Sequence, residues 1–371
     1  MSVFTRLYRG ETRYDFIGHR KYWYIASAVI VLIALLSIIF RGFNYGIEFK
    51  GGTQFQVPVK ASVSVDDVRK AFADAGVTPE STQQVGSGGE RQIIVKTETL
   101  ASAKQLTVKQ DAAKNLKLNS SDITLTSVSS SWGHDISVKA IEGLIIFLIA
   151  VSIYISIRYE WRMAIGALAG LLHDLVVAAG IYSIVGFEVT PSTVVGLLTI
   201  LGFSLYDTVV VYDKVAENTK DILTTARMTY SEAANLAVNQ TLMRSINTSL
   251  ISLLPVAGLL FVGVGLMGVG TLQDLALILF VGLASGAYSS LFLCTPVVVD
   301  LTERDPKYQA LTRRVLARRA SDAKKGADGG QTDYFAEALA PRRRLATPAA
   351  PPKPGAKPQI PRGAKAPRKK K

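Results

Sequence analysis

The chain has 371 residues, 49% of them hydrophobic, and a mean hydropathy of +0.26. This apolar content excludes an ordinary soluble protein and indicates a membrane protein. The single cysteine, Cys294, excludes an intrachain disulfide.

The first predicted element is a membrane-spanning helix at Tyr22–Phe40, which follows an N-terminal segment at residues 1–21. This stretch has 19 uncharged residues, close to the ~20 that a helix needs to cross a bilayer. No small-residue cleavage motif follows it, so we expect an uncleaved helix and not a signal peptide.

Residues 41–139 are predicted to form a small α+β domain. The chain from Gly46 to Val57 is expected to be extended around a glycine pair, and Ser64–Asp67 resembles a capping box that opens a helix ended by Gly76. Further strand and helix patterns follow at Gln83–Val85, Arg91–Glu98, Ala101–Leu116 and Asp122–Ser129. The order β-α-β-β-α-β predicts a ferredoxin-like fold without a catalytic or nucleotide-binding motif.

Five more apolar stretches in residues 140–299 bring the predicted number of transmembrane helices to six. They are Ile141–Ile157, Met163–Val185, Pro191–Tyr212, Ser245–Gly270 and Leu275–Val299, with a connection at about 213–243. Small residues spaced four apart, at Gly166–Gly170 and Gly282–Gly286, predict close helix packing. Pro255 and the glycines at 263, 265, 268 and 270 predict a flexible fifth helix.

Residues 300–371 are predicted to be a disordered basic tail. They hold 19 Lys/Arg and 7 Asp/Glu, so they carry +12 of the net charge of +13. From Pro341 onward the chain has eight prolines, eleven basic residues and no acid, a composition that cannot bury a core. We expect the tail to attract anionic lipid, and contact with the ribosome is the alternative, without specific nucleic-acid recognition.

Lys and Arg near the helix ends predict the orientation. Basic residues precede the first helix, occupy the turn between the second and third at Arg158 and Arg162, and lie between the fourth and fifth. The turns near Glu188 and Gln273 carry none. Both termini are therefore predicted to be cytoplasmic, and residues 41–139 extracytoplasmic.

Asp207 lies inside the fourth apolar stretch, where a carboxylate costs roughly 2.5–3.5 kcal/mol to insert into the bilayer. Gly196, Ile200, Ser204 and Asp207 fall near one helix face, so the acid is expected to face the bundle interior and serve an ion pathway. The alternative is an acid that reaches the headgroups. Asp207 is five residues, or about 8 Å, short of the predicted helix end, which disfavours that alternative.

Other polar residues lie at membrane depth. His173 and Asp174 fall in the middle of the third helix and point about 100° apart, and their expected role is either structural or in proton transfer. Arg244 enters the fifth helix from the side where the fourth helix ends, so it is expected at a depth similar to that of Asp207. A guanidinium beside a carboxylate would stabilise both charges, and the alternative is that Arg244 snorkels to the headgroups.

Four stretches of this sequence resemble the SecF family, one of the two subunit types of the bacterial SecD–SecF protein-export complex. This complex belongs to the resistance-nodulation-division superfamily. The stretches are Asn44–Thr53, Arg158–Asp174, Gly202–Asn218 and Asn239–Ser245. The chain departs from the family pattern at Tyr206, where Asn is common, and also at Glu48, Lys214 and Ala216.

The resemblance implies a polytopic protein of the bacterial inner membrane that is a translocase accessory subunit and not an enzyme. Its implied partners are SecD, the SecYEG channel and the exported preprotein, and its energy source is the proton gradient, without a metal or other cofactor. By resemblance, Asp207 is the proton-responsive carboxylate and Arg244 its switching partner, with His173, Asp174 and Asp213 as secondary candidates.

Two other classes of membrane protein compete with this function. A small-molecule proton exporter of the same superfamily usually has two duplicated halves and two large external domains, whereas this chain has one half and one small domain. A passive membrane scaffold would have no need of an acid at the depth of Asp207.

Overall fold

The computed structural model describes residues 14–59, 63–86, 91–266 and 273–325. The chain divides into two compact units, Met1–Ala317 and Arg318–Lys371. The prediction of a disordered tail over residues 300–371 was wrong for its first part, because α12 (Thr295–Glu303) ends there and α13 (Pro306–Lys325) packs Leu311 and Val315 into the core. The predictions for the rest of the tail, for the first charged residues of the chain and for Gly268 and Gly270 lie outside the described residues.

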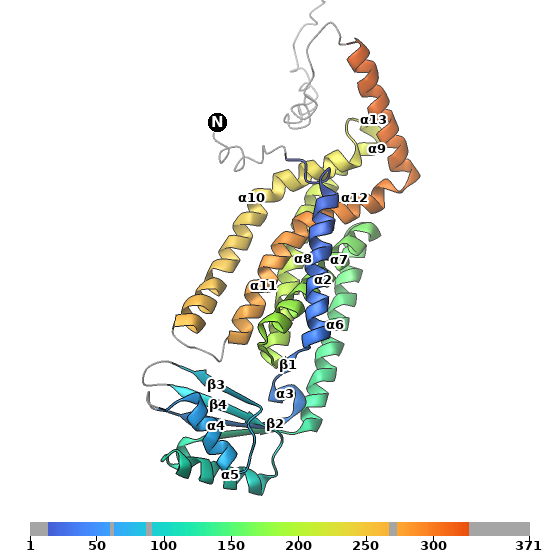
Figure 1. Ribbon diagram of the computed structural model, residues 1–371. Coiled ribbons are helices and arrows are strands. Elements are labelled where there is room, and N and C mark those ends of the chain that lie inside the picture. The colour runs from blue at the N-terminus through green and yellow to red at the C-terminus, as the bar shows by residue number, and fades with distance from the viewer. Residues whose placement is uncertain (1–13, 60–62, 87–90, 267–272, 326–371) are drawn as a thin grey trace, which may run out of the picture. The chain divides into compact units, whose positions relative to one another are not determined.

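The six predicted spans are confirmed as six helices that are long and apolar enough to cross a membrane (Figure 1). In chain order, the helices that form or open the six spans are α2 (Arg20–Arg41), α6 (Ser130–Arg158), α7 (Trp161–Val185), α8 (Pro191–Thr219), α10 (Tyr230–Ala257) and α11 (Gln273–Ser289). The fifth span continues into a π-helix, η3 (Gly258–Leu266), and the sixth into the π-helix η5 (Ser290–Cys294) and α12 (Thr295–Glu303). The short helix α9 (Ile222–Thr225) lies between α8 and α10, and α13 (Pro306–Lys325) follows α12.

The helix ends have clear chemical causes. Thr190 caps α8 through a capping box with Thr193, and Pro191 occupies its first turn. Thr229 and Glu232 form the same box at the start of α10. Gly186 ends α7 in the left-handed conformation, with a φ of 79°.

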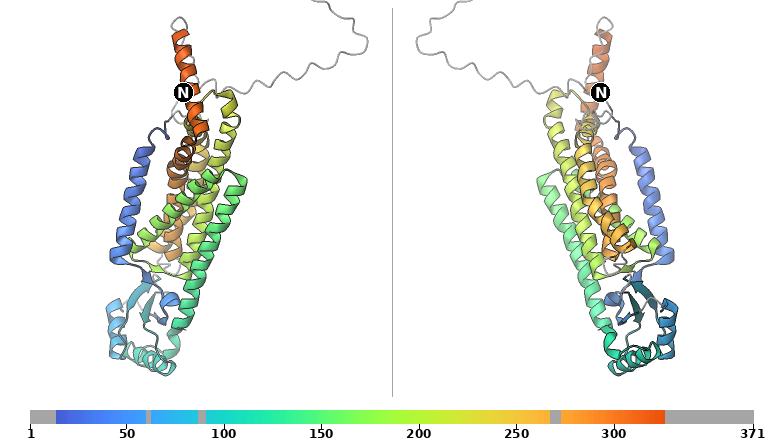
Figure 2. Two further views of the ribbon diagram at one scale, coloured as in Figure 1. Left: turned by 90° about the vertical axis from the view of Figure 1, so that its right-hand side faces the viewer. Right: turned by 90° about the vertical axis from the view of Figure 1, so that its left-hand side faces the viewer.

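The bundle has an inner and an outer part. Figure 2 shows α2 and α6 on opposite sides of the other helices. Only 11% of the apolar stretch of each is buried, compared with 50% for α7. None of the most apolar 18-residue stretch of α10 is buried, so α10 presents a wide uncovered face.

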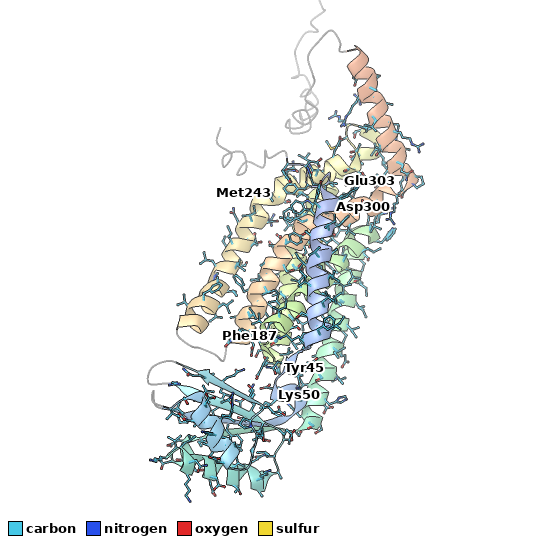
Figure 3. All side chains as sticks on the ribbon, viewed as in Figure 1. Tyr45, Lys50, Phe187, Met243, Asp300 and Glu303 are labelled. Carbon is cyan, nitrogen blue, oxygen red and sulfur yellow. The ribbon has the colours of Figure 1, made fainter. Side chains whose placement is uncertain are left out.

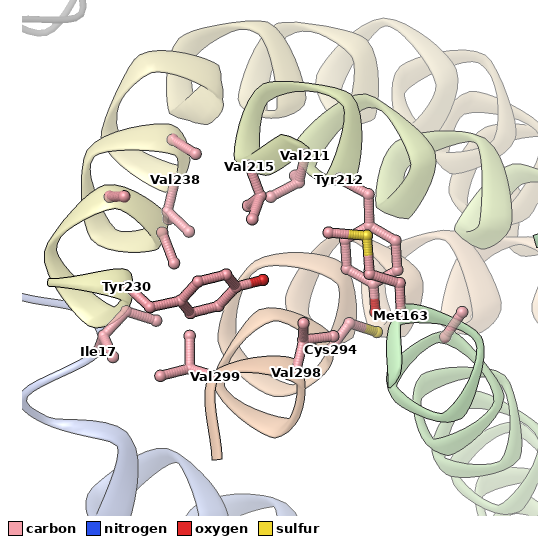
Figure 4. Packing of buried hydrophobic residues seen from close by; sticks show 14 of the residues in the cluster. Ile17, Met163, Val211, Tyr212, Val215, Tyr230, Val238, Cys294, Val298 and Val299 are labelled. Atoms are coloured by element: carbon pink, nitrogen blue, oxygen red, sulfur yellow. The ribbon is translucent and has the colours of Figure 1, made fainter. Parts of the chain in front are cut away.

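The core of the bundle packs around Tyr212, Tyr230 and Cys294 (Figure 4). The predicted close packing at the small-residue faces is confirmed. A Cβ added at Gly166 would lie 2.6 Å from the Tyr212 hydroxyl, and one at Gly170 would overlap the Cys294 sulfur. Cys294 is fully buried and acts as packing, as predicted.

Residues 44–128 form the α+β unit. It consists of β1 (Asn44–Tyr45), α3 (Ile47–Lys50), β2 (Gly52–Pro58), α4 (Val65–Asp74), β3 (Ser81–Val85), β4 (Gln92–Thr97), α5 (Ser102–Asn115), η2 (Ser120–Asp122) and β5 (Thr124–Val128). The strands β2 to β5 and the helices α4 and α5 follow the predicted order, and the capping box at Ser64 and Asp67 is present. The sheet is antiparallel, with strand order β3-β4-β2-β5.

One prediction for this unit was wrong. Residues 47–50 were expected to be extended, but they form the short helix α3. The helix packs against α6, and a Cβ at Gly133 of α6 would clash with the Phe49 carbonyl. The extended stretch begins only at Gly52, after Gly51 turns the chain with a φ of 80°.

The α+β unit is joined to the loop between α7 and α8. In that loop β6 (Glu188–Val189) pairs in parallel with β1, near Tyr45 and Phe187 in Figure 3. Lys96 of β4 forms an ion pair with Glu188, and both side chains are largely buried. This loop leads directly into α8, the helix that carries Asp207.

The other end of the bundle is held by charged and amide contacts. Arg20 of α2 lies 3.1 Å from both Asp300 and Glu303, which are labelled in Figure 3. Before α2, the backbone of residues 14–17 is bound by two buried amides of α10, Asn235 and Asn239. The first part of α10 is therefore fixed, whereas its later part is uncovered.

Candidate functional site

Asp174 of α7 is the centre of a hydrogen-bonded cluster inside the bundle. Its side chain is 1% exposed, and three serine hydroxyls donate to its carboxylate. Ser204 of α8 lies 2.6 Å from Oδ2, Ser289 lies 2.7 Å from Oδ2, and Ser285 lies 2.6 Å from Oδ1. These distances are typical of well-formed O–H···O hydrogen bonds.

Asp207 of α8 is also buried, with 8% of its surface exposed, and it faces the bundle interior as predicted. The Ser290 hydroxyl donates to its Oδ2 at 2.8 Å. Gly196, Ile200 and Ser204 are buried on the same helix face, so the predicted stripe is confirmed.

The two carboxylates are linked by neighbouring serines. Ser289 donates to Asp174, and the next residue, Ser290, donates to Asp207. The close approach of α11 to α8 depends on Gly286, where an added Cβ would lie 2.9 Å from the Ser204 Cβ. We call this group of buried side chains the polar layer; it consists of Asp174, Asp207, Ser204, Ser285, Ser289 and Ser290.

His173 is buried beside Asp174, with its Nδ1 3.2 Å from Asp174 Oδ1. Its ring lies 5.9 Å from the Tyr288 ring, between centroids. The buried Nε2 has no hydrogen-bond partner in the described part of the chain. His173 therefore belongs to the polar layer, although it faces different neighbours from those of the Asp174 carboxylate.

Arg244 lies outside this layer. Its side chain is exposed, and among the described residues it forms no ion pair with Asp207 within 4.0 Å. Its Nη2 instead lies 3.4 Å from the hydroxyl of Tyr206, the residue before Asp207. Arg244 is thus at the predicted depth, but it faces the uncovered side of α8 and α10.

Asp213 lies apart from the other candidates, at the exposed end of α8. It accepts a hydrogen bond of 2.5 Å from Tyr159 and lies 3.7 Å from Arg158, at the edge of a cleft of about 620 Å³. Burial, with the nearby carboxylate, raises the pKa of Tyr159 above its ordinary value, so Tyr159 remains the donor.

A small cavity of about 30 Å³ leads to Asp207 from the uncovered face. Its polar lining comes from Ser204, Tyr206 and Asp207 of α8 and from Thr248, Ser249 and Ser252 of α10. A cavity of this size can hold a water molecule, which needs on the order of 10–15 Å³ of such space. The cavity therefore has room for a water molecule beside Asp207.

The serines of α11 were not predicted as site residues. The sequence signal was the spacing of Ser285 and Ser289, four residues apart on the helix face that was interpreted only as a packing surface. Across the described ranges no group of three or more His, Cys, Asp or Glu could hold a metal ion.

Comparison with known proteins gives the family. The model for the C-terminal region of the protein export membrane proteins SecD and SecF matches residues 108–304, and the model for the SecD/SecF GG motif matches residues 36–63. The chain belongs to the SecD/SecF family. The first match covers the polar layer and Arg244, and the second covers Gly51 and Gly52.

Relatives place the chain with the SecF type of subunit. It is 49% identical over 321 residues to the protein translocase subunit SecF of Streptomyces coelicolor, covering 86% of this chain and 85% of that protein. It is 46% identical over 340 residues to the SecF of Mycobacterium tuberculosis, covering 90% of this chain and 77% of that protein. This chain is therefore a multi-pass membrane protein with a role in protein export.

A solved structure supports the same fold. The crystal structure of SecDF from Thermus thermophilus, described as a translocon-associated membrane protein, matches with a TM-score of 0.69 and 30% identity. The match covers 79% of this chain and 39% of that chain. SecDF joins both subunit types in one chain, which indicates a SecD partner for this protein.

Proposed function

We propose that this chain, together with a SecD subunit, uses the proton gradient to assist the export of unfolded preproteins through the SecYEG channel. Asp207 is the residue that takes up and releases the proton. The observation that carries the proposal is a buried carboxylate with a hydroxyl partner at 2.8 Å and a cavity at its side. An acid at this depth is costly to insert, and acids in such positions usually mark an ion pathway.

The proton gradient supplies energy of the right size. Moving one charge through 100 mV is worth about 2.3 kcal/mol, comparable to the cost of an acid within the membrane. Protonation of Asp207 can therefore shift the bundle between two arrangements. In this proposal Asp174 and His173 form the inner part of the same proton-coupling layer, whereas Asp213, which is exposed and lies apart from that layer, is not needed for proton uptake.

The uncovered face of α8 and α10 is where we place SecD. Tyr206 and Phe203 of α8 are 53% and 46% exposed, and they lie beside Arg244 and the cavity at Asp207. A guanidinium at membrane depth is costly in lipid, so a partner helix must cover it. The switching role of Arg244 is then exerted across this interface, and not through an ion pair inside the chain.

The α+β unit is proposed to be a ferredoxin-like extracytoplasmic domain at residues 41–139 between the first two spans. Both termini are proposed to be cytoplasmic, and the basic tail at residues 300–371 to contact anionic lipid or the ribosome. Labelling of a Ser321→Cys variant in a Cys294→Ala background tests the orientation. We expect an impermeant thiol reagent to react only after the cells are opened, and reaction in intact cells would contradict this orientation.

Export and efflux can be separated in one strain. A bacterium depleted of its own SecF subunit is supplied with this chain, and both preprotein export and resistance to a panel of toxic compounds are measured. We expect recovery of export that is lost when an uncoupler dissipates the gradient, with unchanged resistance. Recovered resistance without recovered export would favour a small-molecule exporter, and export that is indifferent to the uncoupler would favour a passive scaffold.

A further inference from the structure

The Ser290 hydroxyl has two acceptors within reach. It lies 2.8 Å from Asp207 Oδ2 and 3.3 Å from the backbone carbonyl oxygen of Ala287. The residue is fully buried. Ser289 repeats the arrangement, at 2.7 Å from Asp174 Oδ2 and 3.3 Å from the carbonyl oxygen of Gly286.

A hydroxyl group carries one proton to donate and two lone pairs that accept. It can therefore donate to only one of these two acceptors at a time. Next to an ionised carboxylate, which only accepts, the Ser290 hydroxyl donates to Asp207. Next to a protonated carboxyl group, the Ser290 hydroxyl accepts a hydrogen bond from the carboxyl O–H. It then donates its own hydrogen bond to the Ala287 carbonyl.

Each state of the acid then leaves its buried polar groups bonded. This matters because a buried donor or acceptor without a partner is strongly destabilising. An apolar side chain at position 290 would leave Asp207 without this partner in both states. A fixed donor, such as an ammonium group, would favour only the ionised one.

The local helix geometry separates the two serines. Ser290 opens the π-helix η5, and Ser289 is the last residue of α11. Short π-helical segments inside helices are frequent at functional sites. Here the change from α-helix to π-helix falls between Ser289, which bonds Asp174 of α7, and Ser290, which bonds Asp207 of α8.

Several groups on packed helices face Asp207. Arg244 of α10 acts on it by charge, and Asp174 of α7 lies across the two serines. Ser245 of α10 is a second buried hydroxyl beside Asp207. Ser290 has the hydrogen bond of good geometry to the acid, at 2.8 Å.

We propose that Ser290 is a positioning residue whose hydroxyl rotates between Asp207 and the Ala287 carbonyl and so stabilises Asp207 in both protonation states. The inference rests on the proposed role of Asp207 and names the group that makes repeated proton uptake there possible. Ser289 has the equivalent position at Asp174, which makes it the matched control.

The test compares Ser290→Ala, Ser290→Thr and Ser289→Ala in the complex with its SecD partner. One readout is the infrared band of the protonated Asp207 carboxyl group, identified as the band that Asp207→Asn removes. The other is gradient-driven export. We expect Ser290→Ala to shift the band and to lower gradient-driven export about tenfold or more, the factor that loss of one hydrogen bond to a charged group gives.

Ser290→Thr keeps the hydroxyl, so it should keep both the band position and the export. Ser289→Ala should leave the Asp207 band in place. An unshifted band and normal export in Ser290→Ala, while Asp207→Asn abolishes export, would overturn the role of Ser290 alone. The same loss in Ser290→Ala and Ser290→Thr would show that size matters at this position and not the hydroxyl, which also overturns it. Normal export in Asp207→Asn would instead remove the proposed function itself.

Discussion

The Arg244 guanidinium donates to the hydroxyl of Tyr206, with Nη2 and the oxygen 3.4 Å apart. Tyr206 is the position where the chain departs from the common family pattern, and it stands directly before Asp207. The cation of α10 therefore contacts the helix of the acid through Tyr206, which points about 100° away from Asp207. This places Arg244 where a second subunit can reach it.

The first prediction concerns this contact. Arg244→Ala should change the unfolding free energy of the isolated chain by less than about 0.5 kcal/mol, because the side chain is exposed. Gradient-driven export should nevertheless fall strongly. Unfolding in mixed micelles and export in cells give the two values, and Arg314→Ala on α13 is a control at another exposed arginine. A large loss of stability with normal export would contradict the account.

The second prediction concerns the serine cluster at Asp174. Asp174→Ala removes the acceptor of three buried hydroxyls and should cost about 3–5 kcal/mol of unfolding free energy. Asp174→Asn keeps an acceptor and should cost about 1–2 kcal/mol. Reversible unfolding in micelles measures both, and Asp213→Ala at the exposed helix end should cost no more than about 1 kcal/mol. Equal costs for Asp174→Ala and Asp213→Ala would contradict the cluster.

The third prediction concerns the ion pair between Lys96 and Glu188. Both side chains are largely buried, so Glu188→Gln removes the direct charge partner of Lys96 and should loosen the pairing of β1 with β6. Hydrogen exchange at the Gly46 amide, which bonds the Val189 carbonyl at 2.9 Å, reports this pairing. The double variant Lys96→Met, Glu188→Leu should restore much of the protection.

An exposed pair provides the control for that experiment. Lys139 and Glu142 are 2.7 Å apart but 77% and 50% exposed, so Glu142→Gln should cost about 0–1 kcal/mol and leave the Gly46 amide protected. Equal exchange at Gly46 in the Glu188→Gln and wild-type chains would show that β1 and β6 are held by other contacts.

Much of the fold could be predicted because the bilayer constrains it strongly. The six spans follow from apolar length alone, and Asp207 was found because an acid in such a stretch is costly. The strands from β2 to β5 were predicted from the alternation of apolar and polar residues, and the start of α4 was predicted from its capping box. Residues 47–50 could not be assigned in this way, because α3 is fixed by its contact with α6, more than 80 residues later.

The partners of the acids were beyond a single sequence. Serines in a transmembrane helix have the same small size as packing residues, so nothing distinguished Ser289 and Ser290 from their glycine neighbours. Their role follows from the register of α11 against α7 and α8, which tertiary packing sets. The sequence placed Arg244 at the right depth, but the direction of its side chain depends on the rotation of α10.

The proton-coupling role of Asp207 is tested most directly in membrane vesicles that contain the complex and an arrested export intermediate. An imposed proton gradient is applied, and completion of export is measured for wild type, Asp207→Asn and the exposed control Asp213→Asn. Asp207→Asn keeps the size and hydrogen-bonding capacity of the side chain but removes its titratable proton. We predict that the gradient accelerates export in wild type and in Asp213→Asn but has no effect in Asp207→Asn. Full acceleration by the gradient in assembled Asp207→Asn complexes would contradict the account.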